Sequence, residues 1–332
     1  MKASCVFGCR RHYSSDSFCW LCDATFVGLL RYTDFRSEAE HRRTLLTHDR
    51  YVAHCLAERM QPSSIFSCPG TTLMSIAIDT MHAGDLGSFQ DAIGSLFWLE
   101  ITNKALYRTN AIGLRALNHE LALYYRANPE FDPTKLTLPQ LRSRQPGYPC
   151  LKAKAGVTRH LVGFALTLAA RHAHGDGERP PFSFRATYRL APHAAEYRRL
   201  VLECFSGLNE YLQNTKEDEY DIQSCQRGMY QYLQSLQALN VLWRRDAPAE
   251  DHGAMPWHIR KKKNHLLQHL VEDHLERWGS PRRFWCYGDE SYVGAIKTLA
   301  SRSKHPHTLE RVVMEKLKVF CGVHAWLERN RE

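Results

Sequence analysis

Apolar residues recur at steps of three and four along most of this chain, and this period limits the possible folds more than any other feature. One segment carries it at Val201, Phe205, Leu208 and Leu212. The same pattern predicts helices over about 85–103, 109–127, 152–174, 192–214, 218–245, 262–277, 288–303 and 307–328. The predicted fold is therefore mainly α-helical, with the apolar stripes forming its core.

A small β element is predicted in one place. The run Leu73-Met-Ser-Ile-Ala-Ile-Asp79 is the best strand candidate, and it follows the turn-forming Cys68-Pro69-Gly70. β-branched residues bounded by Pro and Gly are typical of a strand. We expect Leu73–Asp79 to be a strand that ends at the carboxylate of Asp79.

Composition favours a folded protein with an acidic partner. Hydrophobic residues make up 44% of the 332 residues, which is enough for a buried core. The net charge is +9, and between Pro256 and Glu332 there are 15 Lys and Arg residues against 9 Asp and Glu residues. The longest apolar stretch, Leu161 to Ala170, is about half the length that spans a bilayer. These features favour nucleic acid over a membrane as the partner.

The cysteines point to metal binding in a reducing compartment. Eleven cysteines occur without an apolar leader in Met1–Tyr13, so we expect free thiols in the cytosol or nucleus rather than a disulfide framework. Two close pairs lie near the start, and two thiolate pairs supply the edges of a zinc tetrahedron. The predicted zinc ligands are Cys5, Cys9, Cys19 and Cys22, with His12, His41 or His48 as substitutes. The alternative is four cysteines without a metal.

Three stretches in order carry a resemblance to a known family. They are Cys19-Trp-Leu-Cys22 with His41-Arg42-Arg43, then Ile78-Asp79-Thr-Met81-His82, then His265-Leu-Leu-Gln-His269-Leu followed by Tyr287-Gly-Asp289-Glu290. In this order the chain resembles the back half of a CACTA-type (En/Spm-like) DNA transposase.

The resemblance implies a ribonuclease-H-like core interrupted by a large helical insertion. Three carboxylates in such a core hold two divalent metals for an in-line displacement. By analogy Glu290 matches the last carboxylate, and Asp79 and His82 would flank the metals or the scissile phosphate. The implied parts are an N-terminal zinc-binding segment (1–46), a partial core (47–103), a helical insertion (104–256) and a basic helical part that returns to the core (257–332).

The chain departs from the family where two earlier aspartates are expected. Only 18 residues precede Cys19, and Asp16 is their single carboxylate. We therefore expect an incomplete core, inactive as a nuclease on its own, with Mg²⁺ relevant only if the chain is active. A less favoured interpretation is an active metal-dependent nuclease, which would require further carboxylates near Asp79 and Glu290.

DNA is the expected partner and the nucleus the expected compartment; self-association is left open and no small-molecule cofactor is expected. The predicted DNA-binding residues are Arg260, Lys261, Lys262, Lys263, Arg282, Arg283 and Lys297. The alternative is a zinc-bearing helical module that binds protein or RNA. His265, His269 and Glu272 share a helix face that could bind metal, although structural or supporting roles are favoured.

Overall fold

The computed structural model describes residues 18–57, 61–103, 106–141, 148–174, 193–246, 255–259 and 262–287, together with 298, 314, 315, 318 and 319. The chain divides into two compact units, Met1–Phe284 and Trp285–Glu332. The first unit carries all the elements considered below. The helices predicted over 288–303 and 307–328 lie almost entirely outside the described residues.

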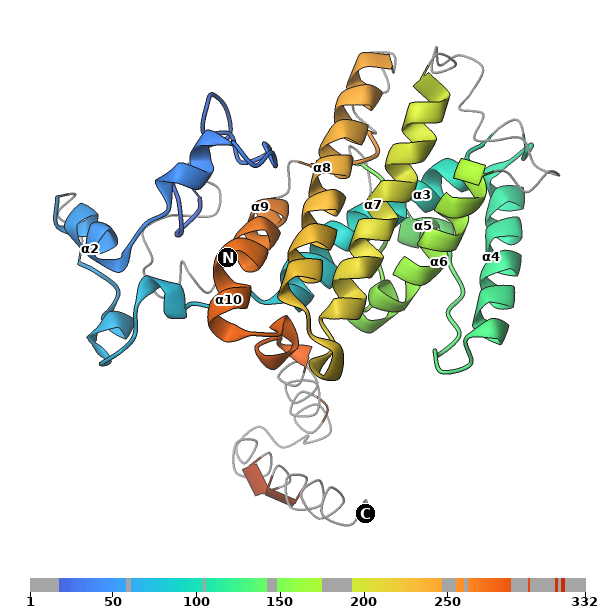
Figure 1. The fold of residues 1–332 in the computed structure, drawn as a ribbon. Helices are drawn as coiled ribbons and strands as arrows, with labels where there is room; N and C mark the ends of the chain where they lie inside the picture. The colour runs from blue at the N-terminus through green and yellow to red at the C-terminus, as the bar shows by residue number, and fades with distance from the viewer. Residues whose placement is uncertain are drawn as a thin grey trace, which may run out of the picture. The chain divides into compact units, whose positions relative to one another are not determined.

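Two long helices form the centre of the first unit. Helix α7 (Ala194–Asn214) and helix α8 (Ile222–Asp246) are joined by a short connection with a 3₁₀ turn, η6 (Glu217–Glu219), and lie side by side in Figure 1. Short loops between helices produce antiparallel neighbours. Their backbones meet at Gly207 and Gly228, where a Cβ on either residue would lie 2.6 Å from the other's carbonyl oxygen. Only glycine permits this approach.

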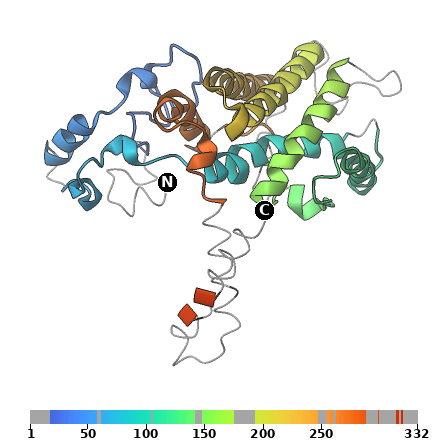
Figure 2. The same cartoon turned by 60° about the horizontal axis from the view of Figure 1, so that its bottom comes forward.

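Helix α3 (Phe89–Ile101) is buried along most of its length and packs mainly against three neighbours. These are α4 (Asn110–Ala127), α6 (Ala155–His174) and the π-helical turn η4 (Met81–Ser88) that leads into α3. Helix α6 also lies along α7. Figure 2 shows α3 between the orange C-terminal helices and α6. Side-chain contacts join α6 to its neighbours: Nε2 of His172 hydrogen-bonds Glu100 (2.9 Å), and Arg171 forms an ion pair with Glu120 (2.6 Å).

The helices predicted over 109–127, 152–174, 192–214 and 218–245 are confirmed as α4, α6, α7 and α8, with ends within a few residues of the predicted ones. The described part of the chain is mainly helical, as the periodicity predicts. Among the described helices, none combines the length and the apolar character that a membrane crossing requires.

The strand predicted over Leu73–Asp79 is wrong. Leu73–Ser75 forms a 3₁₀ turn, η3, because the backbone amide of Thr72 donates to Oγ of Ser75 (3.0 Å) and the amide of Ser75 donates to the carbonyl of Thr72 (2.9 Å). Such local Ser and Thr hydrogen bonds compete with a β ladder. Across the described ranges no β-strand forms, so the structure there contains no ribonuclease-H-like sheet.

The segment before η3 is built from short elements. They are η1 (Glu40–Thr44), α2 (His48–Ala57) and η2 (Ser64–Ser67). The short helix α5 (Leu138–Leu141) lies later in the chain and packs against α3. The final helical segment of the unit comprises α9 (Lys262–His269), the π-helical turn η8 (Leu270–His274), α10 (Leu275–Trp278) and the 3₁₀ turn η9 (Pro281–Arg283). Helix α9 packs on η4 and α8.

Candidate metal centre

Cys19 and Cys22 lie in a buried bend at the start of the described chain. Phe18, Trp20 and Leu21 are at most 4% exposed, and they anchor the bend in the core. The amide of Leu46 donates to the carbonyl of Leu21 (2.7 Å), which ties the bend to the end of η1. The amide of Leu21 points at Sγ of Cys19 (3.4 Å), and such a donor stabilises a thiolate.

His265 and His269 come from helix α9, about 240 residues further along the chain. A separation of four residues places both rings on one helix face, one turn apart. The helix is buried on nearly every side, since all six residues from Asn264 to His269 are buried. Both imidazoles are therefore held toward the Cys19–Cys22 bend rather than toward water.

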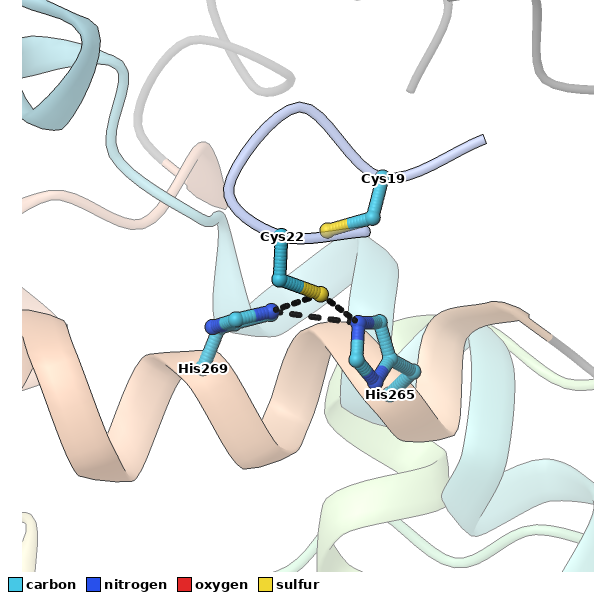
Figure 3. A group of neighbouring side chains, drawn as sticks. All are labelled: Cys19, Cys22, His265 and His269. Atoms are coloured by element: carbon cyan, nitrogen blue, oxygen red, sulfur yellow. Dashed lines mark hydrogen bonds between the residues drawn. The ribbon is translucent and has the colours of Figure 1, made fainter. Parts of the chain in front are cut away.

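The two cysteines and the two histidines form one cluster, here called the Cys2His2 group (Figure 3). Sγ of Cys22 lies 3.2 Å from Nε2 of His265 and 3.3 Å from Nε2 of His269. The two Nε2 atoms are 3.1 Å apart. All four ligand atoms lie within 4.8 Å of one another.

This geometry is close to that of a tetrahedral zinc site. Zn–S bonds of about 2.3 Å and Zn–N bonds of about 2.0 Å place ligand atoms roughly 3.3–3.8 Å apart along the tetrahedron's edges. The group supplies four soft or borderline ligands, and none of its residues is more than 3% exposed. A buried site with four protein ligands leaves no position for substrate or water. The group is therefore suited to a structural metal rather than a catalytic one.

The charges of the group favour a cation at its centre. Burial opposes ionisation of Cys19, but the hydrogen bond with Cys22 and the charges of His269 and His265 hold its pKa well below the usual value. Burial likewise opposes protonation of His269, but the Cys19 thiolate and a hydrogen bond to Asp273 raise its pKa to about 10. A proton on His269 thus balances the thiolate, and a divalent cation would replace that proton.

A carboxylate orients one of the two imidazoles. Nδ1 of His269 lies 2.6 Å from Oδ2 of Asp273, one helical turn further on. A proton shared there leaves Nε2 of His269 free as a metal ligand, as in carboxylate–histidine–zinc triads. The ring of His41 packs at 5.0 Å from the ring of His265, and its Nε2 hydrogen-bonds Gln268 (3.1 Å). His41 therefore supports the group from outside it.

Two residues of the group, Cys19 and Cys22, are predicted as zinc ligands from the sequence. Cys5, Cys9 and His12 lie outside the described residues, so the predicted pairing of Cys5 and Cys9 with Cys19 and Cys22 is not tested. His48 packs instead against Tyr51 and Phe66. The sequence favours supporting roles for His265 and His269, whereas the structure places both in the group that could hold the metal. Their spacing on one helix face was the signal that could have identified them.

Glu272 does not join the Cys2His2 group, although it was placed on the same predicted helix face. Its carboxylate pairs with Arg42 (3.0 Å) and accepts a hydrogen bond from the hydroxyl of Tyr230 (2.8 Å). These contacts connect η8 to η1 and α8. They reinforce the attachment of the N-terminal segment next to the Cys2His2 group.

Asp79 and His82 lie together at the start of η4. Nδ1 of His82 bonds Oδ2 of Asp79, and the amides of Met81 and His82 donate to the same carboxylate. The carboxylate thus caps the turn while also holding the imidazole. Glu290 lies outside the described residues, so its predicted convergence with Asp79 and His82 is not tested.

The helix that carries the histidines also fixes this Asp79–His82 pair. The amide of Ile78 donates to Nδ1 of His274 (3.2 Å), and Nζ of Lys263 donates to the carbonyl of Leu86 (2.9 Å). A Cβ at Gly87 would lie 2.5 Å from the Lys263 side chain. Segment α9–η8 therefore holds both ends of η4.

The predicted DNA-binding lysines of α9 already have internal partners. Lys262 is 9% exposed, and its ammonium lies 4.7 Å from the ring centroids of Phe18 and of Phe26. Lys263 is half-buried and bonds Leu86 as described above. Of the other predicted DNA-binding residues, Arg260, Lys261 and Lys297 lie outside the described residues. Arg283 is exposed on η9, and Arg282 is half-buried there.

Comparison with other proteins gives no family assignment: no protein-family model, curated protein or solved structure matches the chain.

Proposed function

We propose that this chain is a transposase-derived DNA-binding protein in which Cys19, Cys22, His265 and His269 hold a structural zinc ion. The zinc joins the N-terminal bend to helix α9, and α9 in turn holds η4 and the Asp79–His82 pair. On its own the chain has no nuclease activity in this proposal, because one or two carboxylates cannot hold two metals for an in-line displacement.

The observation that carries the proposal is the meeting of two distant motifs in one buried group. Cys19-x2-Cys22 and His265-x3-His269 belong to the first and last of the three stretches that resemble the transposase family. Chance spacing along a sequence gives no reason for such stretches to converge. Their convergence with the ligand types and separations that zinc prefers supports one common metal unit.

Binding of duplex DNA by the zinc-loaded full chain is the direct test. Fluorescence anisotropy with a labelled duplex, repeated over a series of salt concentrations, should give an affinity that falls as salt rises, because cations on the protein release counterions from DNA. The same preparation with Mg²⁺ should leave a supercoiled plasmid intact. Failure to bind duplex DNA even at low salt would refute the DNA-binding function.

A second candidate function is favoured by the all-helical character of the described residues. A zinc-bearing helical module without a sheet is also suited to binding RNA or another protein. The anisotropy experiment separates the two candidates if a structured RNA of the same length is used in parallel. Tighter binding of RNA than of DNA at every salt concentration would favour the module.

A further inference from the structure

A basic groove lies on helix α4, in the part of the chain predicted as the helical insertion. Its volume is about 620 Å³, and one wall is α4 while the other is the loop that follows the helix. The cationic and polar residues that line it are Arg115, Asn118, His119, Arg126, Thr134 and Lys135. The groove belongs to neither the Cys2His2 group nor the basic residues of the C-terminal part.

The helical period places these residues on one face of α4. Arg115, His119 and Arg126 are separated by four and seven residues, which correspond to one and two helical turns. All three are exposed. Leu117 and Leu121, each 1% exposed, occupy the buried face. Burial of the apolar face therefore obliges α4 to present its arginines outward.

The second wall of the groove is fixed by a reciprocal amide contact. Oδ1 of Asn118 accepts from the amide of Leu136 (2.8 Å), and Nδ2 of Asn118 donates to the carbonyl of Leu136 (2.9 Å). Leu136 is itself 1% exposed. The loop is thus attached to α4 at Asn118, and Lys135, the residue before Leu136, is held beside the arginines before any ligand arrives.

Within the described part of the chain, no carboxylate forms an ion pair with the cations that line the groove, Arg115, Arg126 and Lys135. No carboxylate lines the groove. Glu130 and Asp132 lie in the same loop but do not line the groove. The charge of Glu130 acts on Tyr124 and His160, and that of Asp132 acts on His160. The one acidic residue of α4, Glu120, is buried and is held by Arg171.

We propose that this groove binds the phosphate backbone of duplex DNA, as a contact separate from the C-terminal basic residues. The inference rests on the proposed DNA-binding function and adds a location for it. Eleven residues of helix separate Arg115 from Arg126, so the two Cα atoms are about 16 Å apart along the axis. One DNA strand presents a phosphate about every 3.4 Å of axis, so the face extends past roughly five phosphates.

Replacement of the cationic side chains of the groove by neutral glutamine tests the proposal. In the full-length zinc-loaded chain, the groove variant carries Arg115→Gln, Arg126→Gln and Lys135→Gln. The matched control carries Arg199→Gln, Lys216→Gln and Arg227→Gln, which removes three cations already paired with Glu203, Glu219 and Glu210. Both variants lose the same net charge, and Gln is a good helix former.

The measurement is affinity for a labelled duplex as a function of salt. We expect the slope of log affinity against log salt to become shallower by about 2–3 in the groove variant, and affinity at low salt to fall by more than about tenfold, because each phosphate contact contributes about 0.9 to the slope. The control variant should keep the wild-type slope. If the triple variant does not fold, the single variants Arg115→Gln and Arg126→Gln should each reduce the slope by about 0.9.

The outcomes separate this inference from the function on which it rests. Equal slopes for the groove variant and its control would overturn the groove as a DNA contact, while salt-sensitive binding by the wild type would leave the DNA-binding function standing. No binding of duplex DNA by the wild type would refute both. A groove variant that loses affinity for duplex RNA but not for DNA would show that the groove's ligand is RNA, and would overturn the assignment to DNA.

Discussion

The backbone amide of Ile78 donates a hydrogen bond to Nδ1 of His274 over 3.2 Å. This bond joins the residue before Asp79 to the helical segment that carries His265 and His269. An imidazole can accept at Nδ1 only when that nitrogen carries no proton. Burial, with the charge of His269, lowers the pKa of His274 to about 4, so the accepting form is the one present at neutral pH.

Replacement of His274 by Asn should make the protein less sensitive to acid. An unfolded histidine has a pKa of about 6.5, and the folded value is about 4, so its contribution to stability is complete above pH 6.5 and is lost as the pH falls toward 4. The Oδ1 atom of Asn supplies an acceptor that does not titrate. Urea unfolding at pH 7, 6 and 5 should show a smaller loss for His274→Asn than for the wild type, by up to about 1.4 kcal/mol per pH unit. Parallel losses in the two proteins would contradict this role.

The zinc content should follow one pair of cysteines and not the other. We expect the purified chain to carry one zinc, and Cys19→Ser with Cys22→Ser should abolish it, because the hydroxyl group is a poor zinc ligand. Cys5→Ser with Cys9→Ser is the matched control and should leave the zinc content unchanged. Metal analysis by mass spectrometry measures both variants. Loss of zinc in the control would restore the ligand set expected from the sequence.

Replacement of Asp273 by Asn should weaken metal binding without removing a ligand. Asp273 holds Nδ1 of His269, and partners of this kind typically affect metal affinity by about 10- to 100-fold. Competition with a chromophoric chelator should show that loss, while Glu276→Gln, an exposed change in α10, should bind zinc as the wild type does. Equal affinity in all three proteins would exclude a supporting role for Asp273.

Two glycine-to-alanine changes should have opposite effects on stability. A Cβ at Gly207 would lie 2.6 Å from the carbonyl oxygen of Gly228, so Gly207→Ala must separate α7 from α8 at a cost of about 1–3 kcal/mol. At Gly156, in the first turn of α6, a Cβ meets nothing within 4 Å. Gly156→Ala should therefore be neutral or stabilise by up to about 1 kcal/mol. Thermal unfolding compares the two, and a neutral Gly207→Ala would argue against the close packing.

The long helices could be predicted from the sequence because each carries its own apolar stripe. Val201, Phe205 and Leu208 are all fully buried on α7, where their spacing places them on one face. The structure of Leu73–Asp79 could not be predicted from such a stripe. Its apolar residues are compatible with a strand or a turn, and the hydrogen bonds between Thr72 and Ser75 decide for the turn.

The sequence indicates each pair of the Cys2His2 group separately, but not that the two pairs meet. The spacing of Cys19 and Cys22 indicates a thiolate pair, and the spacing of His265 and His269 indicates two imidazoles on one helix face. Neither spacing says which pair meets which, because that depends on the packing of the helices between them. The nearby Cys5 and Cys9 were the natural local partners, whereas the structure joins residues that 243 positions separate.

That separation has a consequence for synthesis. A ribosome adds roughly 5–20 residues each second, so Cys19 and Cys22 leave it about 12–50 s before His265 can join them. Throughout that interval the two thiols lack half of their ligand set and are open to oxidation or to a competing metal. In the proposed site, zinc would bridge residues 22 and 265 only after helices α3 to α8 have emerged. Assembly of the Cys2His2 group should therefore be a late step in maturation. Metal binding by the group should indicate that the preceding helices have folded.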